Sequence, residues 1–499
     1  MKYLYFLFLI VLFLSCNSNS DSENNWKKNA KTVLSGTIEP YNPVSMPSKM
    51  KLFFYDDLFN QITNEVKIDS LGNFHSEFEL AHPQDISFYY RAWLSLILKP
   101  GDSIQLSFDG NQAEKQDLYA SMTLAGDSKD LNTDFHQFLL NDSILDNYYK
   151  PISKLAPQDF KRYHDSVFSY RKKYITEFLD SNTRIDKSLR SWLEMEKDIV
   201  PIINVLEFPM YYRMYNRDKA KISEYPEGFF NSVSNLSSMT EQDFVNSNTA
   251  SLSNHLIFHY YEKINPNNES MDTKLQDSLL FHALQKDFKN NPLPIQLALS
   301  DKIRAGLEGM NTTFIDNNLN ELKSIYADSK IGEAVFETYE KTKAELAKIK
   351  MPSDAGFINF ESKDPKNYLD EIIAKADGKV VYIDHWATWC GPCIGEFKNA
   401  LPNFKKKYKD DIEFVYLCYR SEIEQWKPMI RKFQLSGKHY FVTDEEIETL
   451  QKQMTVDGYP TYTIIDQKGE IVKSDFQYRP SREVTSKIID SLLQNDTSL

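Results

Sequence analysis

The feature that most constrains the fold is a short apolar run that leads directly into a pair of cysteines. Residues 380–383, VVYI, are apolar without alternation, which is typical of a central strand buried on both faces. The segment DHWATWCGPC (384–393) follows, and IGEFKNALPNFKKKY (394–408) then has the pattern of a helix. A strand that feeds a helix in this way predicts an α/β fold, with Cys390 at the N-terminus of the helix.

Cys390 and Cys393 have the placement and spacing of a working redox pair. At a helix N-terminus, unpaired backbone N–H groups and the helix dipole favour an anion, here a thiolate. The two-residue gap keeps the sulfurs close enough to form and break a disulfide with little backbone movement. Pro392 removes an N–H that the helix start leaves unsatisfied anyway. We expect Cys390 to be exposed to partners and to attack, and Cys393 to resolve the mixed disulfide.

The first sixteen residues, MKYLYFLFLIVLFLSC, have the pattern of a secretory signal. Lys2 precedes an apolar run that is too short to span a bilayer, which needs about 20 residues. The segment resembles the signal of a bacterial lipoprotein, which implies that Cys16 becomes the lipidated first residue of the mature chain. With Asn17 after the cysteine, the resemblance also implies the outer membrane as the destination. The alternative is an ordinary cleaved signal with an incidental cysteine.

Periodicity divides the 499 residues into five segments. Residues 1–16 are the expected signal, and 17–30 form a polar, flexible tether. Alternating apolar runs between turn signals indicate a β-sandwich-like domain over 31–125. Helical periodicity indicates an all-α domain over 126–350, and an α/β domain is expected over 351–499. The net charge of −13 argues against nucleic acid as a partner, because no basic cluster departs from this average.

Apolar spacing in the helical domain predicts one buried helix face, formed by Phe160, Tyr163, Val167, Tyr170, Tyr174 and Phe178. A long charged helix is expected over 332–350. His255 and His259 lie four apart on an expected helix, a spacing that can bind a metal. Neither the glutamate of a zincin nor a third ligand accompanies them, so we predict no metal site.

The segment KVVYIDHWATWCGPC (379–393) resembles the active-site segment of the thioredoxin superfamily, in particular the TlpA/ResA-like thiol-disulfide oxidoreductases of bacterial envelopes. The resemblance covers about residues 350–499 and implies a thioredoxin fold there. Trp386 and Trp389 match the tryptophans that flank the family's cysteines, and Trp389 is expected to bind substrate. The dipeptide Gly391-Pro392 implies a reductant more than an oxidant.

Two acidic residues near the cysteines match positions of this family. Asp384 matches its buried acid, and a carboxyl in an apolar strand should have a raised pKa that lets it accept the proton of the resolving thiol. The alternative is a capped structural aspartate. Glu396, three residues after Cys393, matches a glutamate of TlpA-like enzymes. It is either a second proton-transfer group or a solvated helix residue.

Three further residues complete the expected site and its surroundings. The resemblance implies that Tyr459 precedes a cis-proline, Pro460, which faces the disulfide, and that Tyr459 offers its backbone to an extended substrate. His385 departs from the family's usual aromatic residue, and we interpret it as a hydrogen-bonded core histidine. Cys418, in an expected strand, is interpreted as a buried small apolar residue.

Together these patterns predict a thiol-disulfide oxidoreductase of the bacterial cell envelope. One C-x-x-C pair supplies too few ligands for zinc, and no cofactor motif is present. The expected protein is lipid-anchored, facing the periplasm or the surface, and reduces or isomerises disulfides of envelope proteins. A membrane electron donor of the DsbD or CcdA type would re-reduce it. The alternative is a non-catalytic lipoprotein, a binding or scaffold module whose thioredoxin domain senses redox state.

Overall fold

The computed structural model describes residues 30–145, 148–216, 225–266, 271–421 and 423–494. The expected signal, Cys16 and residues 17–29 of the expected tether lie outside the described residues. The chain divides into two compact units, and the first contains the residues through Ala220, Glu224–Pro226 and Thr240–Ala250. Within the described ranges, no helix combines the length and the apolar character needed to cross a membrane.

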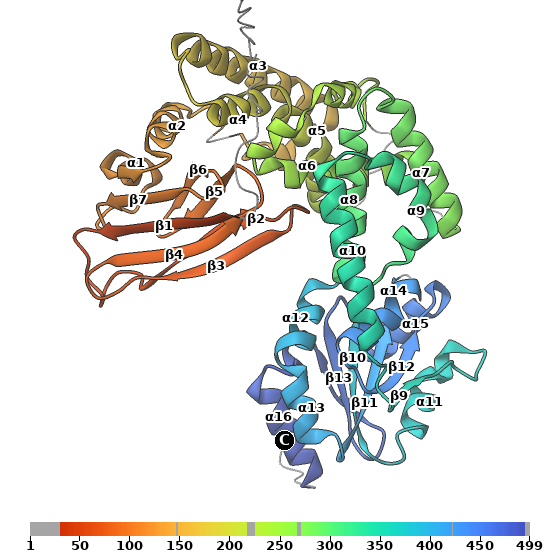
Figure 1. The fold of residues 1–499 in the computed structure, drawn as a ribbon. Coiled ribbons are helices and arrows are strands. Elements are labelled where there is room, and N and C mark those ends of the chain that lie inside the picture. The colour runs from red at the N-terminus through yellow and green to blue at the C-terminus, as the bar shows by residue number, and fades with distance from the viewer. Residues whose placement is uncertain (1–29, 146–147, 217–224, 267–270, 422, 495–499) are drawn as a thin grey trace, which may run out of the picture. The chain divides into compact units, whose positions relative to one another are not determined.

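The first unit begins with two four-stranded sheets, in the orders β4-β1-β7-β8 and β3-β2-β5-β6 (Figure 1). Their strands are β1 (Ala30–Ile38), β2 (Lys49–Tyr55), β3 (Gln61–Lys67), β4 (Asn73–Leu80), β5 (Gln84–Tyr89), β6 (Trp93–Leu98), β7 (Ser103–Phe108) and β8 (Thr123–Gly126). Alternate residues of β2, namely Met50, Leu52 and Phe54, join one apolar core with residues of both sheets. The predicted β-rich region is confirmed.

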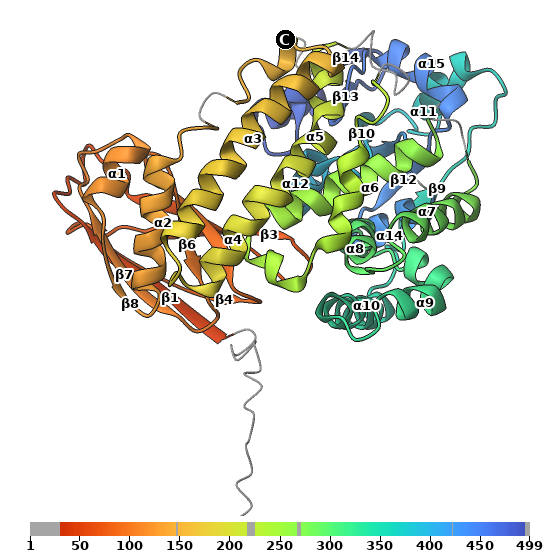
Figure 2. The same ribbon diagram turned by 90° about the horizontal axis from the view of Figure 1, so that it is seen from above.

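Helices dominate the middle of the chain, as predicted. The first unit contains α1 (Lys115–Ser121), α2 (Lys129–Asn141), α3 (Pro157–Ser181), α4 (Lys187–Asp198) and α5 (Val200–Tyr215). Helix α6 (Asn248–Ile264) passes into the second unit, which continues with α7 (Thr273–Asp287), α8 (Leu293–Glu308), α9 (Thr313–Ile325) and α10 (Lys330–Lys348). Figure 2 shows α3, α4 and α5 side by side, and α10 is the predicted long charged helix.

The predicted helix α3 is confirmed, and its predicted face is right only in part. Of the predicted side chains, Phe160 is buried, Tyr163, Val167, Tyr174 and Phe178 are half-buried, and Tyr170 is exposed. The buried side chains are Pro157, Phe160, His164, Phe168, Arg171, Ile175 and Leu179, whereas Tyr170 is 73% exposed. The buried stripe contains His164 and Arg171, which hydropathy alone places outside. Arg171 is tolerated there because it bonds two buried carboxylates, Asp142 at 2.9 Å and Glu196 at 2.5 Å.

The second unit ends in a six-stranded sheet with the order β14-β13-β10-β11-β12-β9. Its strands are β9 (Ala355–Phe357), β10 (Val380–Trp386), β11 (Ile412–Cys418), β12 (Gly437–Phe441), β13 (Thr461–Ile465) and β14 (Ile471–Asp475). Strands β10, β11, β12 and β9 are parallel, and β13 is antiparallel to both β10 and β14. All seven residues of β10 are buried, which confirms the predicted central strand.

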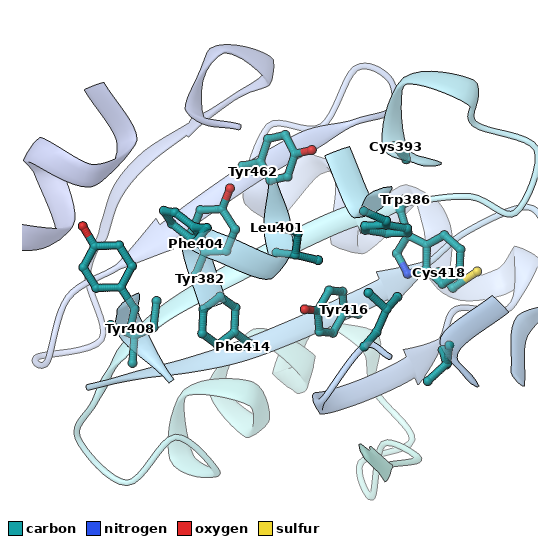
Figure 3. Packing of buried hydrophobic residues seen from close by; sticks show 14 of the residues in the cluster. Tyr382, Trp386, Cys393, Leu401, Phe404, Tyr408, Phe414, Tyr416, Cys418 and Tyr462 are labelled. Carbon is teal, nitrogen blue, oxygen red and sulfur yellow. The ribbon is translucent and has the colours of Figure 1, made fainter. Parts of the chain in front are cut away.

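Helices cover both faces of this sheet. They are α11 (Tyr368–Ala374), α12 (Gly391–Asn399), α13 (Leu401–Tyr408), α14 (Ile423–Lys432), α15 (Asp444–Met454) and α16 (Glu483–Leu493). One apolar cluster joins the sheet to α12, α13, α14 and α16, and Figure 3 shows its aromatic layer, with Tyr382, Trp386 and Tyr416. A second cluster joins the other face to α11 and α15. The predicted succession of β-sheets, helices and an α/β domain is therefore confirmed.

The buried group of Arg171, Asp142 and Glu196 leads to a prediction about stability. In Arg171→Ala, the carboxylates of Asp142 and Glu196 stay buried without their cation, which costs about 3–5 kcal/mol. Amide hydrogen exchange in α3 and α4 should accelerate about a hundredfold or more. Lys172→Ala is the matched control, because the Lys172–Asp198 pair is solvent-exposed and such pairs contribute about 1 kcal/mol or less. Equal acceleration in the two variants would contradict the structural role of Arg171.

Candidate redox site

The two cysteines lie where β10 passes into α12. Cys390 is the N-cap of α12, and its Sγ accepts a hydrogen bond from the Cys393 N–H at 3.2 Å. The two residues form a disulfide with a Cα–Cα distance of 5.3 Å. The predicted close pair at a helix N-terminus is confirmed. After reduction, this position favours the thiolate of Cys390, because the unpaired N–H groups and the helix dipole both stabilise negative charge.

The expectation that Cys390 is exposed is wrong for this disulfide form. Cys390 is 2% exposed and Cys393 is fully buried, and both pack in the apolar cluster that contains Trp386 and Phe397. The outer surface of the junction is instead formed by Gly391 and Pro392, which are exposed. The sulfur is covered because it is bonded toward the interior, where its partner sits on the first turn of the helix.

Asp384 is a buried carboxyl without a hydrogen-bond partner. The residue is 1% exposed, and neither carboxyl oxygen has a partner among the described residues. Burial raises its pKa well above the usual value, and the nearby negative charge of Glu396 raises it further. A capped structural aspartate would accept hydrogen bonds from backbone N–H groups, and Asp384 accepts none in the described structure. The geometry is that of a group that holds or accepts a proton.

Glu396 is a buried residue of α12, not a solvated one. It is 8% exposed, and its two carboxylate oxygens accept hydrogen bonds from the N–H and the hydroxyl of Ser481, at 3.0 and 2.7 Å. Ser481 precedes α16 and is 85 residues away in the chain, so no sequence pattern indicated this contact. Ser481 holds the Glu396 carboxylate within the electrostatic reach of Asp384.

Trp389 precedes Cys390 directly and contacts Tyr459, which packs against the apolar cluster that contains the cysteines. The Tyr459-Pro460 peptide is cis, as the family resemblance implied. Trp389 is 62% exposed, and its ring meets that of Tyr459 edge-on with centroids 5.9 Å apart. Its indole N–H donates to the Arg420 carbonyl at 2.7 Å. An exposed aromatic ring held beside a cis-proline loop offers a contact surface to an extended chain.

His385 and Cys418 are core residues, as predicted. His385 is fully buried, and burial lowers its pKa to about 3, so the ring is neutral. Its nitrogens lie 2.9 Å from the Tyr419 hydroxyl and 2.9 Å from Thr463 Oγ1. Burial raises the pKa of the Cys418 thiol to about 12, which keeps it protonated and unreactive. In the described ranges, no three His, Cys, Asp or Glu side chains gather as metal ligands require.

The segment after β11 supplies contacts that the sequence analysis missed. Ser421 Oγ accepts from the Thr388 N–H at 2.9 Å and donates to the Tyr419 carbonyl at 2.8 Å. Arg420 has a φ of 43°, a left-handed conformation that aims its carbonyl at Trp389. A general rule could have indicated this segment. Ligand and catalytic sites of α/β sheets lie at the carboxyl ends of parallel strands. Strands β10 and β11 are parallel and end side by side, so the residues after β11 lie near those after β10.

Comparison of the sequence with known proteins relates the segment that contains the cysteines to thioredoxin-like proteins. Residues 378–471 match the model of the family described as thioredoxin-like. The C-terminal part of the chain is a thioredoxin-like domain. The chain is 26% identical over 157 residues to the thioredoxin-like protein YneN of Bacillus subtilis, covering 32% of this chain and 88% of that protein.

Two further matches concern the same thioredoxin-like domain. The chain is 26% identical over 116 residues to the thiol-disulfide oxidoreductase ResA of Bacillus subtilis, covering 23% of this chain but only 62% of ResA. A solved structure of a proposed thiol-disulfide oxidoreductase from Bacteroides vulgatus is 34% identical, with a TM-score of 0.22, and the match covers 25% of this chain and 79% of that one. The match with ResA relates the domain in sequence to thiol-disulfide oxidoreductases.

The raised pKa of Asp384 predicts how stability depends on pH. Between the ordinary carboxyl pKa and the raised folded value, the unfolded chain loses this proton first, so folding becomes less favourable as pH rises. Asp384→Asn removes this dependence of stability on pH. The free energy of unfolding of the variant, relative to the parent, should therefore increase by more than about 1 kcal/mol from pH 5 to pH 7.5. This corresponds to a roughly fivefold increase in the relative protection of β10 and β13 amides against hydrogen exchange.

The control for this measurement is Asp411→Asn in the oxidised protein. Asp411 is exposed, so this variant carries the same substitution without removing a buried carboxyl. Equal changes with pH in the two variants would contradict the prediction for Asp384.

Proposed function

We propose that the chain is a protein disulfide reductase of the bacterial cell envelope. The observation that carries the proposal is the combination of a disulfide at the start of α12 with an unpaired, buried carboxyl, Asp384, whose pKa is raised. A structural disulfide needs no titratable group beside it. A two-step exchange does, because the resolving thiol must lose a proton before it attacks.

In the proposed reaction, the Cys390 thiolate attacks one sulfur of a client disulfide. A mixed disulfide forms, and the other client sulfur leaves as a thiolate. Cys393 then loses its proton to the ionised form of Asp384 and attacks the Cys390 sulfur, which releases the second client thiolate and forms the Cys390–Cys393 disulfide. The client gains two electrons, and the protein loses two. Glu396, held by Ser481, is proposed to assist this proton transfer because its negative charge raises the pKa of Asp384.

Clients are proposed to bind as extended chains across Trp389, Tyr459 and cis-Pro460. The exposed indole of Trp389 supports this placement, as does its edge-on contact with Tyr459. Restoring the dithiol needs two electrons, for which we propose a membrane donor of the DsbD or CcdA type. The same protein could isomerise wrongly paired disulfides if Cys393 does not act before the client rearranges.

The proposed chemistry predicts distinct effects for the three described cysteines. Cys390→Ser should abolish reduction of a disulfide-bearing protein in the presence of dithiothreitol. Cys393→Ser should accumulate mixed disulfides with proteins of an envelope extract, seen as reducible bands on non-reducing gels. Cys418→Ala is the control and should keep full activity, because its thiol is buried and protonated.

Activity that survives Cys390→Ser would contradict the proposed enzyme. The enzyme would also be contradicted if the parent shows no turnover and the Cys393→Ser protein traps no partner. That pair of results would favour the alternative, a binding or scaffold lipoprotein whose thioredoxin-like domain senses redox state.

The proposed location rests on the N-terminal sequence alone. We propose that Cys16 is lipidated and that the protein is anchored to the outer membrane, facing the periplasm or the surface. Cys16→Ser should then move the protein from the membrane fraction to the soluble envelope fraction and end the incorporation of labelled palmitate. Unchanged membrane association without label would indicate another means of attachment.

A further inference from the structure

The thioredoxin-like domain contains a buried chain of hydrogen bonds on the face of β10 opposite the cysteines. His385 bonds Tyr419 and Thr463, and Thr463 Oγ1 lies 2.7 Å from Ser474 Oγ. Ser474 Oγ also bonds the Met454 carbonyl. His385 and Thr463 are completely buried, so these groups have no access to water and depend on one another.

The last bond fixes the direction of all the others. A carbonyl only accepts, so Ser474 donates to Met454 and must accept from Thr463. Thr463 therefore accepts from His385, whose Nε2 carries the proton. Nδ1 of His385 is then the acceptor, and the Tyr419 hydroxyl donates to it. The orientation of the Tyr419 hydroxyl is thus set by a neutral imidazole, not by solvent.

Tyr419 connects this chain to Tyr459, which packs against the apolar cluster that contains the cysteines. Its ring stacks on that of Tyr459, with centroids 5.2 Å apart and an interplanar angle of 20°. Tyr459 precedes cis-Pro460 and also meets the ring of Trp389. A shift of the Tyr419 ring would therefore move the residue whose backbone is proposed to receive the client.

We propose that His385 and Tyr419 form a positioning pair: the imidazole fixes the Tyr419 phenol, and the phenol ring fixes Tyr459 in the geometry that binds an extended polypeptide beside the disulfide. This inference rests on the proposed reductase function and extends it. The pair touches neither the client nor the sulfurs. Its effect is on the affinity for a peptide backbone, and the electron-transfer chemistry of Cys390 and Cys393 does not depend on it.

The test compares two substrates in the full chain, with dithiothreitol as reductant. One is a fluorogenic extended peptide with a single disulfide, and the other is bis(2-hydroxyethyl) disulfide, which has no peptide backbone. Tyr419→Phe and His385→Phe should each raise KM for the peptide about three- to tenfold, the effect of one lost hydrogen bond, with kcat unchanged. Rates with the small disulfide should match the parent. The double variant should be no worse than either single one, because the two groups act as a unit.

Tyr440→Phe is the matched control. Tyr440 is buried in the same apolar cluster as Tyr419, but its hydroxyl has no hydrogen-bond partner among the described residues. This variant should behave as the parent with both substrates. Hydrogen exchange in residues 455–459 should accelerate in Tyr419→Phe and stay unchanged in Tyr440→Phe.

The outcomes separate the two proposals. If the parent reduces both substrates and Tyr419→Phe has the parental KM, the positioning pair is overturned while the reductase stands. Equal losses on the peptide and on the small disulfide would also overturn it, because they would indicate an effect on the thiols or on folding. A parent that reduces neither substrate overturns the reductase, and the positioning pair with it.

Discussion

The site depends on one strand that is buried on both faces. All residues of β10 are buried, and successive side chains point to opposite sides of the sheet. Tyr382 and Trp386 lie in the cluster that contains the cysteines, while Val381 and Ile383 lie in the cluster that contains Tyr419. The same alternation places Asp384 on the side of the cysteines and His385 on the side of Tyr419. Two polar residues, adjacent in sequence, therefore have separate surroundings.

The surroundings of His385 provide hydrogen-bond partners, and those of Asp384 do not. His385 has a partner at each ring nitrogen and a lowered pKa, so it is a fixed, neutral connector. Asp384 has no hydrogen-bond partner in the described structure, and the negative charge of Glu396 acts on it, so its ionised form is costly. No hydrogen bond in the described structure fixes the protonation state of Asp384, whereas two hydrogen bonds fix that of His385. The titratable group lies on the same side of the sheet as the sulfurs.

The sequence predicted those parts of the fold and site that depend on local pattern. The apolar run of β10, the cysteine pair and the buried acid are contiguous, and the Tyr459-Pro460 segment was found by resemblance. Contacts between distant segments could not be predicted: Ser481 on Glu396 and Tyr419 on His385 join residues that are 85 and 34 positions apart. The expected exposure of Cys390 was wrong because its sulfur is bonded toward the interior. The expected face of α3 was right only in part, because the most buried stripe also includes His164 and Arg171, whose burial depends on tertiary partners.

The buried ionisable groups of the chain show which of them serve stability and which can serve chemistry. Asp142 and Glu196 share the guanidinium of Arg171, so each of these two carboxylates has a cation beside it within the core. Burial raises the pKa of Asp85 to about 6, yet Asp85 accepts hydrogen bonds from the N–H and the hydroxyl of Ser247, which tie it to a neighbouring segment. Asp384 has neither a cation nor a donor among the described residues. An acid kept in such a position costs stability, and a reaction that needs a proton acceptor beside the sulfurs is a sufficient physical reason for keeping it there.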